Sequence, residues 1–154
     1  MGENSLRNWI TRPEHHPISF LLVEASLVIS HAQVVWKNLE HCGEIYKTYG
    51  ITGVLTFPSF RGQGYGLQVI RAATDYIYQS DADIGMFHCE PGLGDFYSQC
   101  GWLPMREAIT WIGARDHPVR TDELMMMRFF TEKGLRGRGS FESKPVFFDE
   151  DSTW

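Results

Sequence analysis

The chain has 154 residues, of which 43% are hydrophobic and 21% charged, and its formal net charge is −5. This composition is typical of one globular domain over residues 1–154 and excludes a disordered chain. The acidic balance argues against nucleic-acid binding, which needs a basic face. No apolar run reaches the ~18 residues that cross a membrane. The first residues lack the order of a signal peptide, so we expect a cytoplasmic protein.

Three strands are predicted after a lead-in over residues 1–17, in which a short helix is expected around residues 6–10. They are Ile18–Glu24, Leu27–Trp36 and Glu44–Phe57, and each is rich in the residue types that strands favour. A turn is expected over residues 38–43. Gly50 and Gly53, inside the third strand, indicate a bend, a bulge or a close backbone approach.

Apolar residues at three- and four-residue steps then predict an amphipathic helix over Tyr65–Gln79. A short strand is expected at Ile84–Cys89, and Pro91 and Gly101 delimit a second helix, over Pro91–Gln99. These segments form two successive strand–helix units.

Two more strands are predicted at Ala108–Gly113 and Glu123–Thr131. The second is apolar on both faces, as a central strand is, and its three methionines are interpreted as core residues. Several glycines open a looser tail over residues 133–154. The whole order predicts an α+β fold of mixed layers, in which helices flank a mostly antiparallel sheet.

The three cysteines, Cys42, Cys89 and Cys100, are too few and too scattered for a disulfide framework, so we expect reduced thiols. No nucleophile turn surrounds any of them. Histidine precedes two of the cysteines, but neighbours on a strand point to opposite faces and offer one ligand each. A metal site is therefore not expected.

The most informative segment runs from Thr56 to Gly66, with the sequence TFPSFRGQGYG. A strand stops at Pro58, and Arg61 is followed by three glycines at alternate positions. Such glycines let a backbone bend tightly and approach a ligand without side chains in between. The unpaired amides at the start of the next helix lie at the positive end of its dipole. Together these features predict a pyrophosphate-binding loop.

Three other kinds of loop share some of these features. A glycine-rich surface turn remains open. A Rossmann dinucleotide loop is disfavoured, because the spacing is G-x-G-x-G and the chain is too antiparallel for a repeated βαβ sheet. A Walker loop is excluded, because the Gly-Lys-Ser/Thr ending is missing.

Two motifs in order resemble a known family. The segment from Arg61 to Gly66 resembles the R/Q-x-x-G-x-G/A loop of the GNAT superfamily of N-acetyltransferases. Tyr97 to Trp102 is similar to that superfamily's Y-x-x-x-G-F segment, with Trp for Phe. The two motifs lie 36 residues apart, which suits a helix, a strand and a helix. The resemblance covers about residues 20–131.

The resemblance implies acetyl-CoA as co-substrate and direct acetyl transfer to the amine of a small molecule. The pantetheine arm would pair with the backbone of residues 54–56, beside a V-shaped gap between strands, and an amide near the start of that segment would stabilise the oxyanion. Tyr97 would protonate the leaving thiolate. The implied cofactor-binding residues are Val54, Leu55, Thr56, Arg61, Gly62, Gln63, Gly64, Tyr65 and Gly66.

The general base is not identified by the motifs. Many superfamily members place a carboxylate on the strand before the glycine loop, but residues 49–53 offer none here. Thr52 can position a water but cannot act as the base. The remaining candidates are Glu24, His31, Glu44 and Glu90, with a water relay as the default. Without a base the chain could instead be a CoA-binding module that does not catalyse, and a nicotinamide-binding fragment is a third possibility.

Shorter matches, including Gly101–Pro104 and Trp154, resemble the aminoglycoside 2'-N-acetyltransferase branch. The acidic residues 149–151 would then attract a polycation, although they also fit a solvated tail. Superfamily members usually carry more structure before the first strand than the 17 residues found here. An N-terminally shortened fold would leave the acceptor site open, and on this ground we expect a homodimer.

Overall fold

The computed structural model describes residues 11–150 and 153–154, so the helix expected around residues 6–10 lies outside the described residues. Three antiparallel strands come first: β1 (Ile18–Glu24), β2 (Leu27–His41) and β3 (Glu44–Thr56). The predicted turn at 38–43 begins too early. Strand β2 continues to His41 because Leu39 and His41 are buried while Asn38 and Glu40 are exposed, which is the alternation of a strand with one face covered.

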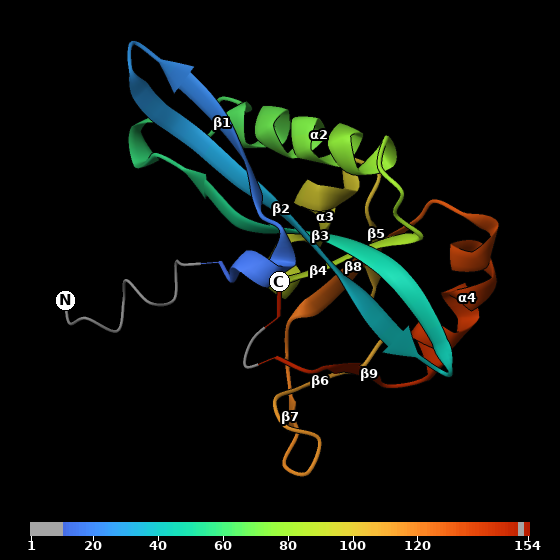
Figure 1. The fold of residues 1–154 in the computed structure, drawn as a ribbon. Helices are drawn as coiled ribbons and strands as arrows, with labels where there is room; N and C mark the ends of the chain where they lie inside the picture. Colours follow the sequence, from blue (N-terminus) through green and yellow to red (C-terminus); the bar gives the residue numbers. More distant parts are fainter. Residues whose placement is uncertain (1–10, 151–152) are drawn as a thin grey trace.

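Helix α2 (Tyr65–Tyr78) connects β3 to the parallel strand β4 (Ile84–Cys89), as predicted. Four apolar residues of α2 are buried against the sheet: Val69, Ile70, Ala73 and Ile77. The predicted helix at 91–99 is present as a 3-10 turn (Pro91–Leu93) followed by α3 (Gly94–Ser98). Figure 1 shows α2 lying along one side of the sheet.

Strand β8 (Leu124–Phe129) pairs antiparallel with β4 and with β5 (Leu103–Met105). The resulting six-stranded sheet has the order β1-β2-β3-β4-β8-β5. Met125, Met126 and Met127 are at most 2% exposed, so the methionine run is core, as predicted. The sheet is antiparallel except between β3 and β4, and it confirms the predicted fold class.

The prediction of a looser tail is wrong for most of residues 133–154. Helix α4 (Glu132–Ser143) is capped by Thr131, whose side chain accepts a hydrogen bond from Gly134 N. Gly134 and Gly137 permit close packing, since a Cβ would lie 2.4 Å from Asp83 O at the first and 2.4 Å from Tyr46 Oη at the second. The glycines that suggested a loop are therefore packing positions of a helix.

A second, three-stranded sheet has the order β7-β6-β9 and consists of β6 (Thr110–Ile112), β7 (Val119–Arg120) and β9 (Val146–Phe148). It lies on the side of the large sheet away from α2, near the C-terminal residues (Figure 1). Trp154 is 8% exposed and packs on Gly50 of β3. Gly50 is thus a close backbone approach, one of the alternatives predicted for it.

Candidate active site

Strands β3 and β4 separate soon after they meet. Within the described residues they pair at two positions only, Thr48 with Ile84 and Tyr49 with Gly85. Beyond these pairs the two strands diverge, and the backbone of β3 on that side is left without a neighbouring strand. This is the gap that the family resemblance implied, and it is where a ligand could add as an extra strand.

A bulge in β3 changes which side chains face the gap. Thr52 lies opposite Gln33 and Leu55 opposite His31, so three steps on β3 match two on β2, with Gly53 at φ +60° in the bulge. The extra residue inverts the alternation. Thr52 therefore lies on the face of Leu55, away from α2, while Val54 lines the cavity described below.

The glycine loop has the geometry that its sequence predicts. Gly62 and Gly64 have φ values of +77° and +84°, which favour glycine strongly. The first intrahelical hydrogen bond runs from Gln68 N to Gly64 O, so the amides at the start of α2 precede the ladder and remain available to an anion. At Gly66 a Cβ would lie 3.3 Å from Thr56 Oγ1, so this glycine keeps α2 close to β3.

A cavity of about 840 Å³ lies between this loop and α3. Its size is that of a typical small-molecule site. Of the eleven residues predicted from the sequence, nine line it: Val54, Leu55, Thr56, Arg61, Gly62, Gly64, Tyr65, Gly66 and Tyr97. Thr52 and Gln63 do not. Thr52 precedes the bulge, and the Gln63 side chain donates to Ser59 O at 3.5 Å.

Five further residues complete the lining: Phe60, Leu67, Glu90, Leu93 and Phe96. Of these five residues, only Glu90 is a candidate from the sequence, as one of four possible bases. Phe60, Leu67 and Phe96 each flank a motif residue directly, so the neighbours of the motifs were the signal that could have found them. Leu93 carries no such signal, because it reaches the cavity from the 3-10 turn after β4.

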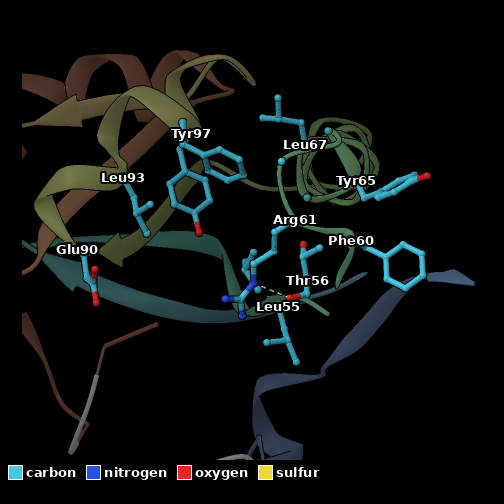
Figure 2. Close-up of a pocket in the computed structure, with 14 residues that line it drawn as sticks. Leu55, Thr56, Phe60, Arg61, Tyr65, Leu67, Glu90, Leu93 and Tyr97 are labelled. Atoms are coloured by element: carbon cyan, nitrogen blue, oxygen red, sulfur yellow. Dashed lines mark hydrogen bonds between the residues drawn. The ribbon is translucent and has the colours of Figure 1, made fainter. Parts of the chain in front are cut away.

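Tyr97 is 5% exposed, and its ring packs edge-on against Phe87 and Phe96 with centroids 4.7 and 5.0 Å away. Figure 2 shows its hydroxyl directed from α3 toward β3. This hydroxyl has no hydrogen-bond partner among the described residues. Burial, and then the nearby Cys89 and Cys100, raise the pKa of Tyr97 to about 12, so the group is protonated at neutral pH and can donate.

The four candidate bases lie in different places. Glu90, directly after β4, lines the cavity and is shown beside it in Figure 2. Glu24 and Glu44 lie at hairpin ends, opposite Leu27 and His41. His31 is held on the other face by Gly53 O and Ser19 Oγ. The structure therefore brings only Glu90 of these four to the cavity.

Cys89 and Glu150 do not offer competing sites. Burial raises the pKa of Cys89 to about 11, which keeps it a neutral thiol. Glu150 accepts hydrogen bonds from Lys37 and His15, so its charge is compensated within the fold and is not available to a polycation.

Among residues 11–150 and 153–154 there is no group of three or more residues placed to hold a metal ion. In the same described ranges, no helix has the length and apolarity to cross a membrane.

No protein-family model matches the sequence, and no curated protein matches it either. Solved structures do resemble the fold. YhbS of Escherichia coli, a GNAT family N-acetyltransferase in complex with CoA, has a TM-score of 0.59 and 16% identity over 86% of this chain and 67% of its own. A GNAT family acetyltransferase of Brucella melitensis in complex with acetyl-CoA has a TM-score of 0.51 and 16% identity over 88% and 64%.

An Enterococcus faecalis V583 protein identified as a probable N-acyltransferase has a TM-score of 0.51 and 18% identity over 61% of this chain. The chain spans only 23% of that protein's length. At these identities the likeness concerns the fold. The chain therefore has the fold of the GNAT N-acetyltransferases: a large, mostly antiparallel sheet flanked by helices, with its fourth strand diverging beside a glycine loop.

Proposed function

We propose that this protein is an acetyl-CoA-dependent N-acetyltransferase that transfers an acetyl group directly to a primary amine of a small molecule. One observation carries the proposal. The glycine loop, the unpaired side of β3 and the Tyr97 hydroxyl all meet at a single cavity, where β3 and β4 part. The fold shared with proteins crystallised with CoA or acetyl-CoA supports it.

The Arg61 amide donates to Pro58 O at 3.3 Å, so the pyrophosphate of CoA would bind the amides of residues 62–66, and its pantetheine arm would extend along residues 54–56 of β3. Gly62 and Gly64 leave the loop open, because a Cβ at either one would meet no atom within 4 Å. Arg61 is folded back, with its Nε donating to Thr56 O at 3.0 Å, so the guanidinium lies at the junction of loop and strand. There it can contact a phosphate.

The chemistry follows from the residues around the cavity. The amine nitrogen attacks the thioester carbonyl, the C–S bond of the tetrahedral intermediate breaks, and the Tyr97 hydroxyl gives its proton to the leaving thiolate. The amine must first lose a proton. Glu90 is the carboxylate at the cavity, and we assign it this role, directly or through a water. Thr52 does not line the cavity, so this scheme gives it no role.

The proposal extends to the class of amine that accepts the acetyl group. Glu90 gives the cavity a negative wall that suits an ammonium group, and polyamines and aminoglycosides both present such groups. Glu150 lends no support to a polycation, because it is bound to Lys37 and His15. The homodimer stays a prediction, which light scattering at micromolar concentration would test.

A thiol-release assay with acetyl-CoA tests the proposal. Free CoA should appear only when an amine is added, across a panel of polyamines, aminoglycosides and simple primary amines. Gly139→Ala serves as a control variant that should release CoA at the wild-type rate, because Gly139 is exposed on α4 and a Cβ there meets no atom within 4 Å. Binding of CoA without turnover on any amine would instead favour a CoA-binding module that does not catalyse.

A further inference from the structure

His31 makes an unusual contact with the bulge of β3. Its Nδ1 lies 2.6 Å from Gly53 O, and its Nε2 lies 3.1 Å from Ser19 Oγ. A carbonyl oxygen can only accept, so Nδ1 must carry the proton and donate it. Nε2 then accepts from the Ser19 hydroxyl, whose oxygen in turn accepts from Gln33 Nε2 at 3.1 Å. Both ring nitrogens are therefore engaged, and the imidazole is fixed in one tautomer.

The bond to Gly53 O determines where the next amide points. In a trans peptide the carbonyl and the following N–H point in opposite directions, and the described residues contain no cis peptide bond. With Gly53 O turned to His31, the Val54 N–H must point the other way. The imidazole thus holds the orientation of the whole Gly53–Val54 peptide.

The strand register gives the same direction independently. Phe57 N donates to Ile29 O, so on this part of β3 the odd-numbered residues 55 and 57 turn their backbone groups toward β2. Val54 and Thr56 turn theirs to the opposite side, from which β4 has diverged. Thr56 O confirms this, because it accepts from Arg61 Nε at the cavity. Val54 lines that cavity, so its N–H faces the space proposed for the thioester.

The geometry points to a positioning role for His31: its imidazole locks the Gly53–Val54 peptide so that the Val54 N–H is aimed at the thioester oxygen. This inference rests on the proposed function. Glycine in a bulge can rotate its peptide more freely than any other residue, so the orientation needs an external hold. A hydrogen bond to the carbonyl also polarises the peptide and strengthens the N–H as a donor to the developing oxyanion.

This role also accounts for the place of His31 in the fold. It does not line the cavity, and both of its ring nitrogens are occupied, so it acts through Gly53 and not on the acceptor amine. At Gly53 a Cβ would lie 3.3 Å from His31 Cε1, which shows how closely ring and bulge are packed.

Three variants test the inference by steady-state kinetics. His31→Leu removes the donor and should lower kcat about tenfold, less than the loss of a whole oxyanion donor, while the Kd for CoA stays within about twofold. His31→Asn offers an amide N–H near the position of Nδ1 and should recover most of kcat. Ser19→Ala removes only the partner of Nε2 and should stay within about twofold of the wild-type kcat.

A spectroscopic measurement separates positioning from a general structural role. With acetyl-CoA labelled with ¹³C at the carbonyl, the wild type should shift the carbonyl stretch of the bound thioester to lower frequency than in solution. In His31→Leu the stretch should return toward the solution value, and in His31→Asn it should stay near that of the wild type. If both kcat and the carbonyl stretch were unchanged in His31→Leu, the role of His31 would be ruled out while the proposed function would stand.

Two further outcomes are decisive. ¹⁵N NMR of the imidazole in the ligand-free wild type must show the Nδ1–H tautomer, and finding Nε2–H would overturn the inference even if His31→Leu failed to fold. If the wild type bound no acetyl-CoA in calorimetry, the proposed function would fall and the inference with it. Normal binding and turnover together with the wrong tautomer would remove only the role of His31.

Discussion

Gly50 and Trp154 touch so closely that a Cβ on Gly50 would come within 2.2 Å of the indole Cε3, and within 2.6 Å of Met86 O. The carbonyl of Trp154 also accepts a hydrogen bond from His88 N of β4 at 2.5 Å. Trp154 therefore bridges β3 and β4 on the face away from α2, just past the point where their pairing ends.

Gly50→Ala should destabilise the protein by roughly 2 kcal/mol, because the core must shift to admit the added methyl group. The free energy of unfolding in urea measures this. Gly139→Ala is the control and should be neutral or slightly stabilising, since it adds a methyl group to an exposed helix position. Equal stability of the two variants would contradict the contact between Gly50 and Trp154.

Tyr97→Phe should lower kcat about 100-fold or more, because the leaving thiolate loses its proton donor. Tyr78→Phe, on the exposed side of α2, should leave the rate unchanged. With the pKa of Tyr97 raised to about 12, the hydroxyl stays protonated through mildly alkaline pH. The wild-type rate should therefore rise with pH as the amine loses its proton, and should not fall again below about pH 10. A wild-type rate for Tyr97→Phe across this range would rule out the acid role.

Much of the site could be predicted from the sequence because its signals are local. The glycine spacing from Arg61 to Gly66 sets the loop conformation, and the same short stretch starts α2. The sequence could not show that Thr52 lies outside the cavity lining, because side-chain direction depends on the bulge at Gly53 and a glycine only hints at a bulge. Glu90 could not be chosen among four candidates, since its place at the cavity depends on how β3 and β4 diverge.

The fold likewise has elements that the local sequence predicts and elements that it does not. The strands up to β4 and helix α2 follow from hydrophobic periodicity. Helix α4 does not, because Gly134 and Gly137 lower its helix propensity and are explained only by the backbone and side chain packed against them. The burial of Trp154 likewise depends on Gly50, about a hundred residues earlier, so tertiary contacts override the local signal.

Glu90→Gln should lower kcat/KM for the amine about tenfold or more, since the cavity loses the carboxylate that takes the proton of the ammonium group. The Kd for CoA should not change. Glu44→Gln is the matched control, because Glu44 lies at the hairpin end opposite His41. If both variants retain the wild-type kcat/KM, a water relay without Glu90 must take the proton.

His88 should make the protein less stable in mild acid. Burial lowers the pKa of His88 to about 4, so the folded protein does not protonate it while the unfolded chain does, near its ordinary value. The contribution of neutral His88 to the free energy of unfolding is therefore fully present above pH ~6.5. It is lost as the pH falls toward about 4, by roughly 3 kcal/mol at most.

Urea unfolding from pH 7 to pH 4.5 measures this loss. His88→Gln should flatten the profile, whereas His117→Gln should not, because the His117 side chain is 90% exposed. An identical pH profile for the wild type and His88→Gln would show that this imidazole is not kept neutral by the fold.

The central claim is that the amides between Arg61 and Gly66 bind the pyrophosphate of CoA. Titration calorimetry of the wild type and Gly64→Val, with CoA and with NAD, tests it most directly. Gly64 has φ +84°, so valine both strains the loop and places a side chain over its amides. We predict that the wild type binds one CoA per chain and no NAD, and that Gly64→Val binds neither. Absence of heat with CoA, or equal binding of CoA by Gly64→Val, would contradict the account.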